Sequence, residues 1–369
     1  MRGPMAAAQA PPRPSLTARV FRGALATGLG IAMLTSGLIV LALAGLESGG
    51  VAFALALCLA ILPVPIYLAL VLWIDRFEPE PVRMIVMTFA WGATIACLVA
   101  ILLNTIGEVI VSDQLGTHAG EIYGSSFSAP VVEESAKGAV LFGLFWWRRE
   151  EFNGLIDGIV YAALVGLGFA MTENVLYYGR GAAEEGIVGA VVTFVVRGIM
   201  SPFAHPLFTA MTGIGLGLAV TSRSKTFRIV APLAGLGLAM VLHSLWNTAA
   251  GAGQFLGVYV LIMLPIFLVL WGVIALGLRR EARLIAAHLR GVLPDAEVAA
   301  LSSLKARRRA RRAAKRHGGR KAKRAVADLQ QVAAELAFHR AQGPRDRSGQ
   351  ARESALLARI AARRAELAS

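Results

Sequence analysis

Seven side chains that can carry charge lie inside or against apolar segments in the middle of this chain of 369 residues. They are Glu133, Glu134, Lys137, Glu173, Arg197, His205 and His243. A charge at the centre of a bilayer costs about 2.5–3.5 kcal/mol or more, so such residues usually line a cavity and take part in chemistry or transport. The long apolar segments on either side of this block carry none, which makes the block the strongest functional signal in the sequence.

The first motif is a pair of adjacent carboxylates followed by a lysine. Glu133 and Lys137 are four residues apart, so they share one helical face and can form an ion pair. Glu134 is rotated by about 100° and can address a different neighbour. Two adjacent carboxylates in a medium of low dielectric repel each other, which favours a proton on one of them and suits general acid or base chemistry. A buried ion pair that only joins helices is the alternative for this motif alone.

Three further motifs follow in later apolar segments. Glu173 and Asn174 are adjacent, His205 lies in a Ser-Pro-Phe-Ala-His-Pro segment, and His243 and Asn247 share a helical face four residues apart. The prolines beside His205 predict a helix start or kink, where freed backbone groups need polar partners. The histidine could serve those groups, bind a metal or stabilise an oxyanion.

Together, carboxylates and two imidazoles are the groups needed to activate water for attack on an amide. One glutamate would take the proton, while imidazole and Asn247 would stabilise the oxyanion or hold a divalent metal such as zinc. Glu173, His205 and His243 form a candidate metal set of two histidines and one glutamate. The sequence contains neither His-Glu-x-x-His nor Gly-x-Ser-x-Gly, so the familiar zinc-peptidase and serine-hydrolase motifs are absent.

The elements that must position these residues are apolar and long. With 56% hydrophobic residues and a mean hydropathy of +0.62, the chain is predicted to be an all-α, multi-pass transmembrane bundle of about eight spans, in contact with lipid. The predicted spans are 24–46, 51–74, 84–107, 128–147, 155–178, 199–221, 229–250 and 255–278.

The placement of Lys and Arg predicts the orientation. Basic residues lie in the N-terminal arm, after the second, fourth and sixth spans, and in the tail, whereas the connections after the first, third and seventh spans have none. Both termini are therefore expected to be cytoplasmic in the cell membrane. We expect Ile187–Gly198 to lie at the membrane surface or to insert partly, ending at Arg197, which leaves Arg197 outside the polar group. A ninth crossing there would place the basic loop after Thr221 outside.

This orientation places the polar residues at a common depth. At 1.5 Å per residue, Glu133 and Glu134 lie roughly 6–8 Å from the outer end of their span, and Glu173, His205 and His243 roughly 7–10 Å from theirs. Packing residues without a shared role would have no reason to align in this way. The sequence therefore predicts one polar site in the outer third of the membrane.

The ends of the chain differ from its middle. We expect a disordered arm over 1–22, a transmembrane domain over 23–278 and a basic cytoplasmic tail over 279–369. From Arg279 onward the chain has 23 Lys or Arg and 8 Asp or Glu, a balance of +15. Helical spacing of apolar residues predicts helices over Ala325–Arg340 and Leu356–Leu367. Such a tail is expected to contact anionic lipid headgroups. Nucleic acid is disfavoured because the tail has a single aromatic residue, Phe338.

The four motifs, in this order, resemble those of the PrsW family of intramembrane proteases, which is related to the CAAX-prenyl-endopeptidase and bacteriocin-processing superfamily. The matching residues are Glu133, Glu134, Lys137, Phe169, Glu173, Asn174, His205, His243 and Asn247, together with the Asp-Arg-Phe-Glu-Pro-Glu-Pro loop at 75–81. The resemblance covers roughly residues 50–280. It implies an all-helical membrane protein that cleaves a membrane-anchored protein on its extracytoplasmic side, an anti-sigma factor in the best-known case, by metal-dependent or glutamate-based chemistry.

Two other functions use the same residue types. An ion-coupled transporter needs intramembrane Glu, Lys and His, usually near the midplane and between inverted repeats. The sequence has no second Glu-Glu-x-x-Lys half, and its polar residues lie off-centre. A non-catalytic membrane scaffold or immunity-type protein would keep the fold without the activity.

Overall fold

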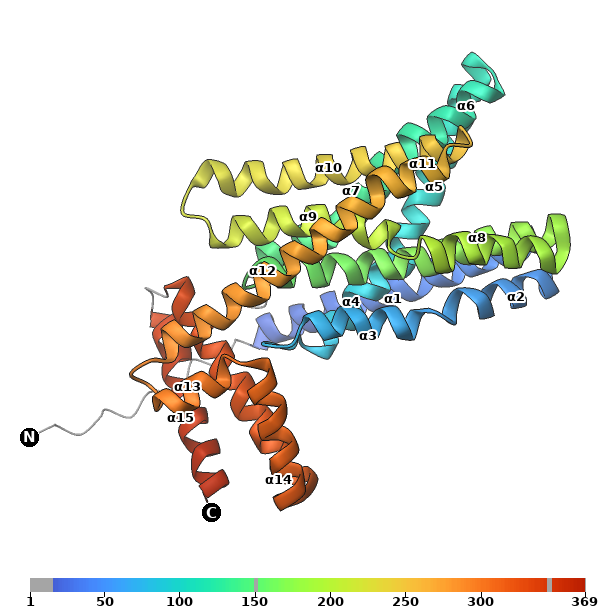
Figure 1. The fold of residues 1–369 in the computed structure, drawn as a ribbon. Helices are drawn as coiled ribbons and strands as arrows, with labels where there is room; N and C mark the ends of the chain where they lie inside the picture. The colour runs from blue at the N-terminus through green and yellow to red at the C-terminus, as the bar shows by residue number, and fades with distance from the viewer. Residues whose placement is uncertain (1–15, 149–151, 344–346, 369) are drawn as a thin grey trace, which may run out of the picture. The chain divides into compact units, whose positions relative to one another are not determined.

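The computed structural model describes residues 16–148, 152–343 and 347–368, and in these ranges the chain is all-helical apart from one isolated bridge (Figure 1). The described residues form two compact units. The bundle unit comprises 22–75 and 80–273, and the tail unit comprises 16–21, 76–79 and the residues from 274 onward. The all-helical prediction is confirmed.

Within the described ranges, twelve α-helices precede the tail helices. They are α1 Leu16–Ser48, α2 Gly50–Ile61, α3 Val64–Ile74, α4 Val82–Trp91, α5 Cys97–Leu115, α6 Thr117–Tyr123, α7 Ala129–Trp147, α8 Leu155–Phe194, α9 Ala204–Thr221, α10 Lys225–Gly251, α11 Phe255–Val258 and α12 Leu264–Leu289. Helix α1 begins at Leu16, within the arm 1–22 that is expected to be disordered. Residues 1–15 of the arm lie outside the described residues.

Six helical stretches of the described chain are long and apolar enough to cross a membrane. They are Arg19–Ser48, Gly50–Ile74, Val82–Leu115, Leu155–Thr221, Lys225–Gly251 and Phe255–Leu289. The stretch Leu155–Thr221 includes two of the predicted spans. The predicted span at 128–147 coincides with α7, which contains two glutamates and a lysine in addition to apolar residues. The number of crossings and their direction remain predictions.

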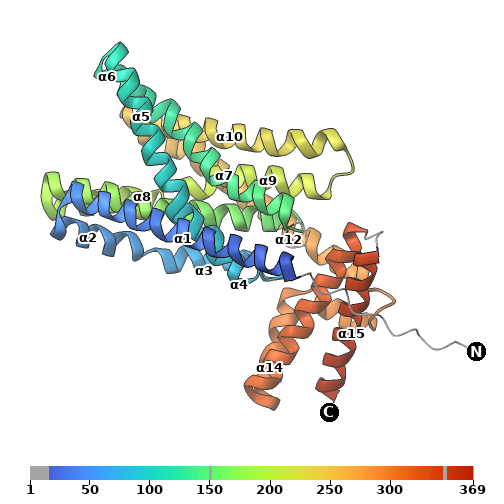
Figure 2. The same ribbon diagram turned by 180° about the vertical axis from the view of Figure 1, so that it is seen from behind.

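Helix α8 is the centre of the bundle unit. Nearly every residue in its first six turns is buried, and it packs against α2, α3, α4 and α9 (Figures 1 and 2). Glycines permit the close crossing with α9, because a Cβ on Gly158 would lie 2.1 Å from the carbonyl oxygen of Gly213. Small residues at helix contacts are typical of membrane bundles. Helices α7 and α10 then pack against α9, so four helices with polar motifs are neighbours.

Helix α8 turns back on itself at Gly186. This residue has φ 67° and ψ −152°, a conformation that favours glycine, and it separates two helical arms. The arms are closely packed, since a Cβ on Gly189 would lie 2.2 Å from the carbonyl oxygen of Gly181. The returning arm continues into a π-helical turn, Val195–Met200. We call residues 173–200 the α8 hairpin.

The tail unit has its own apolar core. It contains the end of α12 with α13 Asp295–Leu301, α14 Leu304–Gln342 and α15 Arg347–Ala368. Helix α14 turns back at Gly319, which has φ 70°. The buried core includes residues from all four helices and from the loop at 76–79, among them Phe77, Leu289, Leu301, Leu336 and Ile360.

Candidate active site

Lys137 joins the two carboxylates of α7. Its Nζ lies 2.8 Å from Glu134 Oε1 and 3.3 Å from Glu133 Oε2, and the lysine side chain has no exposed surface. The ammonium also lies 3.8 Å from the centre of the Phe169 ring on α8. The predicted Glu133–Lys137 contact is present, and Glu134 makes the shorter contact of the two.

His205, at the start of α9, connects α7 with α8. Its Nδ1 lies 3.0 Å from Lys137 Nζ, and its Nε2 lies 2.8 Å from Glu173 Oε2. An ammonium only donates and a carboxylate only accepts, so Nδ1 carries the lone pair and Nε2 carries the proton. Glu173 therefore sets the tautomer of His205.

His243, on α10, is held in the same way by a different carboxylate. Its Nδ1 lies 3.0 Å from Glu134 Oε1, and its ring stacks on Phe208 with 4.9 Å between ring centres. The proton is on Nδ1, so the lone pair is on Nε2, which lies 3.9 Å from Glu133 Oε2. Thr209 donates to the other oxygen of Glu134 at 3.0 Å, a contact that no sequence motif indicated.

Three buried residues of this cluster could hold a metal ion together. One ligand atom from each of Glu133, His205 and His243 lies within 4.8 Å of the other two. Two histidines and a glutamate form a known catalytic zinc set, and each histidine has a carboxylate on its other ring nitrogen, as metal-bound histidines usually do. Three carboxylates face two fixed cations, Lys137 and Arg197, which leaves a negative balance. The donor set fits a divalent cation.

This group differs from the predicted metal set in its carboxylate. In the structure Glu173 contacts Nε2 of His205 and orients the ring. Glu133, not Glu173, supplies the carboxylate oxygen of the group of three possible ligand atoms. The spacing of single motifs could not distinguish the two, because both glutamates reach the neighbourhood of His205 from different helices.

Arg197 belongs to this polar cluster, contrary to the expectation that it lies at the membrane surface. Its guanidinium pairs with Glu173, donates from Nε to Asn174 Oδ1 at 2.8 Å and lies 3.8 Å from the centre of the Tyr177 ring. The turn at Gly186 brings Arg197 back beside Glu173. The glycine signalled a break in the sequence, but the return of the chain depends on the packing of the two arms.

The side chain of Asn247 forms its hydrogen bond with the turn before α7 and not with His243. Its Nδ2 donates to the carbonyl oxygen of Ser125 at 2.9 Å, in the π-helical turn Gly124–Ser128 that precedes α7. Ser244 donates to the neighbouring carbonyl of Ser126 at 2.6 Å. Helix α10 is thereby fixed to the start of the helix that carries the two glutamates.

Hydroxyl groups serve the backbone that the kink before α9 leaves free. Tyr67 donates to the carbonyl oxygen of Gly198 at 2.8 Å and Tyr259 to that of Met200 at 2.9 Å. The Ser201 hydroxyl donates at 2.7 Å to the carbonyl oxygen of Val196, which also accepts from the Ser201 amide at 3.0 Å. The predicted need for polar partners is therefore met by these residues. Both ring nitrogens of His205 instead contact residues of the polar cluster, Lys137 and Glu173.

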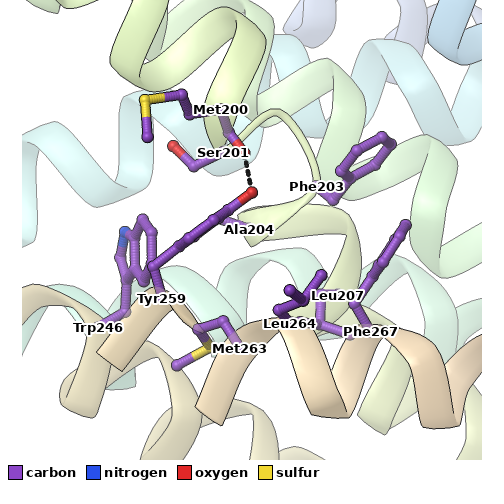
Figure 3. A pocket seen from close by; sticks show the side chains of 10 residues that line it. All are labelled: Met200, Ser201, Phe203, Ala204, Leu207, Trp246, Tyr259, Met263, Leu264 and Phe267. Carbon is purple, nitrogen blue, oxygen red and sulfur yellow. Dashed lines mark hydrogen bonds between the residues drawn. The ribbon is translucent and has the colours of Figure 1, made fainter. Parts of the chain in front are cut away.

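An apolar pocket lies beside the kink. It has a volume of about 80 Å³ and is lined by Met200, Ser201, Phe203, Ala204, Leu207, Trp246, Tyr259, Met263, Leu264 and Phe267 (Figure 3). Ala204 precedes His205, and Trp246 follows His243 by about one turn. The helices that carry the two imidazoles thus share a second, apolar neighbourhood.

Much of this chain is similar to known proteins. The sequence model of the PrsW family of intramembrane metalloproteases matches residues 80–270, which include all four polar motifs and only the end of the loop at 75–81. The chain is 29% identical to Protease PrsW of Bacillus subtilis over 201 residues, 53% of this chain and 82% of that protein. It is 28% identical to Protease PrsW of Oceanobacillus iheyensis over 54% of this chain and 84% of that protein.

Protease PrsW of Geobacillus kaustophilus is 30% identical over 145 residues, 39% of this chain and 58% of that protein. No solved structure gives a significant match. The residues after 270 lie outside the family match.

Proposed function

Because this chain belongs to the PrsW family of intramembrane metalloproteases, we propose that it is an endopeptidase that cleaves a membrane-anchored protein near the extracytoplasmic face. The observation that carries this proposal is the buried convergence of Glu133, His205 and His243 from three helices. The two imidazoles present oriented nitrogen lone pairs, and Glu133 presents a carboxylate. These are groups that metal-assisted hydrolysis of an amide requires. The predicted depth of the polar residues supports cleavage on the outer side.

We assign to Glu133 the carboxylate that would hold the ion. Glu134 uses one oxygen for Lys137 and His243 and the other for Thr209, so its role is to position these groups. Glu133 makes longer contacts, 3.3 Å to Lys137 and 3.9 Å to His243. The Glu133 oxygen is therefore the one that can exchange partners as water or a cation enters.

The chain's own residues prepare the site for a divalent metal, zinc being the candidate. Glu133 Oε2, His205 Nδ1 and His243 Nε2 would hold the ion, once the ammonium of Lys137 releases the lone pair of His205 Nδ1 that it contacts at 3.0 Å. A cation there would activate water and polarise the peptide carbonyl. Glu173 and Glu134 keep the protons on the outer imidazole nitrogens. Lys137 supplies a second positive charge, close enough to the cluster to stabilise an oxyanion.

The substrate class follows from the location of the site. A polar site within a helical bundle acts on chain that enters from the membrane, and single-pass proteins such as the anti-sigma factors implied by the family resemblance are the first candidates. Asn247 is not assigned to the oxyanion, because it contacts Ser125 instead.

Comparative membrane proteomics tests this function. Cells that express the wild-type protein should accumulate truncated forms of one or a few single-pass proteins, and cells that express Glu133→Gln at equal abundance should keep them intact. Glu121→Gln, an exposed carboxylate in α6, is the control and should behave as wild type. Identical profiles for wild type and Glu133→Gln would contradict proteolysis and favour a scaffold or transporter.

A further inference from the structure

One stretch of the tail unit carries many exposed cations and contains no acidic residue. Residues 305–324 of α14 contain no Asp or Glu. Ten of their basic side chains are exposed: Lys305, Arg308, Arg309, Arg312, Lys315, Arg316, Arg320, Lys321, Lys323 and Arg324. We call residues 305–324 the basic hairpin, since α14 turns back at Gly319 within them.

Several acidic side chains of the tail form ion pairs with arginines outside this stretch, while Glu281 and Glu78 lie near the buried Arg307. Four such pairs are Glu297 with Arg364, Asp328 with Arg363, Glu335 with Arg359 and Glu353 with Arg340. None of the arginines in these pairs lies within 305–324. The charges of the tail are therefore segregated, with mixed pairs on α13, α15 and the later part of α14 and positive charge alone on the basic hairpin.

Two arginines of the same stretch hold the hairpin in shape. Arg307 is 2% exposed and donates to the carbonyl oxygens of Phe77 at 2.9 Å and Gln330 at 3.2 Å. Arg311 donates to Gln330 Oε1 at 2.6 Å. The inner arginines thus join the two arms of α14 to each other and to the loop at 76–79, and the exposed cations project from a folded support.

The chemistry of this surface fits a dense layer of negative charge. Helix α12 runs from a candidate membrane span into the tail unit without interruption, so the hairpin is tethered to the bilayer. Single-stranded nucleic acid is bound largely by aromatic stacking, and residues 305–324 contain no aromatic ring apart from the imidazole of His317. We propose that the basic hairpin binds the headgroups of anionic phospholipids at the membrane surface.

This proposal does not depend on proteolysis and can be tested with the full chain in lipid nanodiscs. A fluorophore on Ala313→Cys, exposed on the hairpin, reports contact with lipids that carry a quencher on the headgroup; Cys58→Ser removes the exposed native thiol, and Cys97 is buried. Quenching should be several-fold stronger with phosphatidylglycerol and phosphatidylcholine at 1:3 than with phosphatidylcholine alone. It should fall as NaCl is raised, because salt screens the attraction.

Two matched variants separate the hairpin from total charge. Arg312→Gln/Arg316→Gln and Arg359→Gln/Arg364→Gln each remove two positive charges, but only the first changes the hairpin. Each basic residue near an anionic surface contributes about 1 kcal/mol, about fivefold in the contact equilibrium. The hairpin variant should therefore lose quenching at much lower NaCl than the α15 variant.

Several outcomes would overturn the proposal. One is equal quenching in the two lipid mixtures, and another is quenching that salt does not change. If quenching of a label on Ala358→Cys, in α15, increased equally with phosphatidylglycerol, the basic hairpin would not be the specific site of lipid contact. Binding of a short DNA duplex at physiological salt, without any response to phosphatidylglycerol, would assign the surface to nucleic acid.

Discussion

Arg197 and Glu173 form an ion pair across the two arms of the α8 hairpin, although they are separated by 24 positions in the chain. Through Glu173 the arginine acts on His205, which receives a hydrogen bond partner for its protonated nitrogen. Arg197, which was expected at the membrane surface, therefore contacts Glu173, and Glu173 contacts His205 of the candidate metal group.

Removing Arg197 should disturb the site without removing any of its reacting groups. We expect Arg197→Ala to lower cleavage about 10–100-fold, the usual effect of losing an outer partner of a metal ligand. Arg197→Lys should restore part of it, since lysine keeps the charge but not the forked geometry that reaches both Glu173 and Asn174. Zinc affinity, measured beside cleavage, should fall in parallel. Arg180→Ala, an exposed arginine of the same hairpin, is the control; an equal loss there would argue against a specific role.

The two adjacent glutamates should differ when each is changed to glutamine. Glu133→Gln removes a proposed ligand and should abolish both zinc binding and cleavage. Glu134→Gln keeps one oxygen that can still accept from His243, while its amide NH2 takes the place of the oxygen that accepts from Thr209. Zinc should therefore still bind, about 10–100-fold more weakly. Metal content per protein after dialysis against buffered zinc measures the difference. The reverse order of effects would exchange the two roles.

Zinc should stabilise the folded protein through the same three residues. Ligand that binds only the folded state at 100 times its Kd adds about 2.7 kcal/mol to the free energy of unfolding. The thermal transition of the chelator-treated protein should therefore rise with added zinc. His205→Ala and His243→Ala should remove the response, while His118→Ala, an exposed histidine in α6, should keep it. A full response in His205→Ala would exclude that residue as a ligand.

The backbone beside His205 leaves no space for a side chain on α8. A Cβ on Gly166 would lie 2.7 Å from the nitrogen of Pro206 and 2.8 Å from the carbonyl atoms of His205. Gly166→Ala should displace the start of α9 and lower stability by about 1–3 kcal/mol, with loss of cleavage. Gly237→Ala places its Cβ in open space on α10 and should be neutral or slightly stabilising. Thermal unfolding and cleavage of both variants provide the comparison.

Asp75, between the candidate spans that end at Ile74 and begin at Val82, should make stability depend on pH. Burial raises the pKa of its carboxyl to about 7; the amide of Glu80 opposes this in part, and the charge of Asp157 adds to it. The unfolded carboxyl has a pKa of about 3.9, so the folded state binds the proton more tightly and stability falls as pH rises from about 4 to 7.

Asp75→Asn should flatten that dependence. The asparagine oxygen can still accept from Glu80, so the fold should tolerate the change. The thermal transition, followed from pH 4.5 to 8, should decline more steeply in the wild type than in the variant. Parallel declines would show that another group controls the slope.

Many residues of the candidate site can be predicted from the sequence, because ionisable side chains in apolar segments are energetically unfavourable and therefore rare. Ionisable residues in apolar helices are expensive, so Glu133, Lys137, Glu173, His205 and His243 stand out wherever the helices are placed. Helical periodicity also predicts the contact of Glu133 with Lys137, since residues four apart meet on one face. These inferences depend only on local geometry and on the environment of a long apolar segment.

Which groups meet across helices was decided by the tertiary structure. The packing of α7, α9 and α10 places Glu133, rather than Glu173, in the group of three possible ligands with the two histidines. The same packing places Asn247 beside Ser125. The return of the chain at Gly186 brings Arg197 to Glu173, a contact that no periodicity encodes. Composition and residue spacing predict an all-helical chain with a block of ionisable residues in apolar segments and a basic end. The contacts between these residues on different helices depend on how closely the helices pack at their glycines. Sequence spacing within one helix does not determine the distance between side chains on two helices.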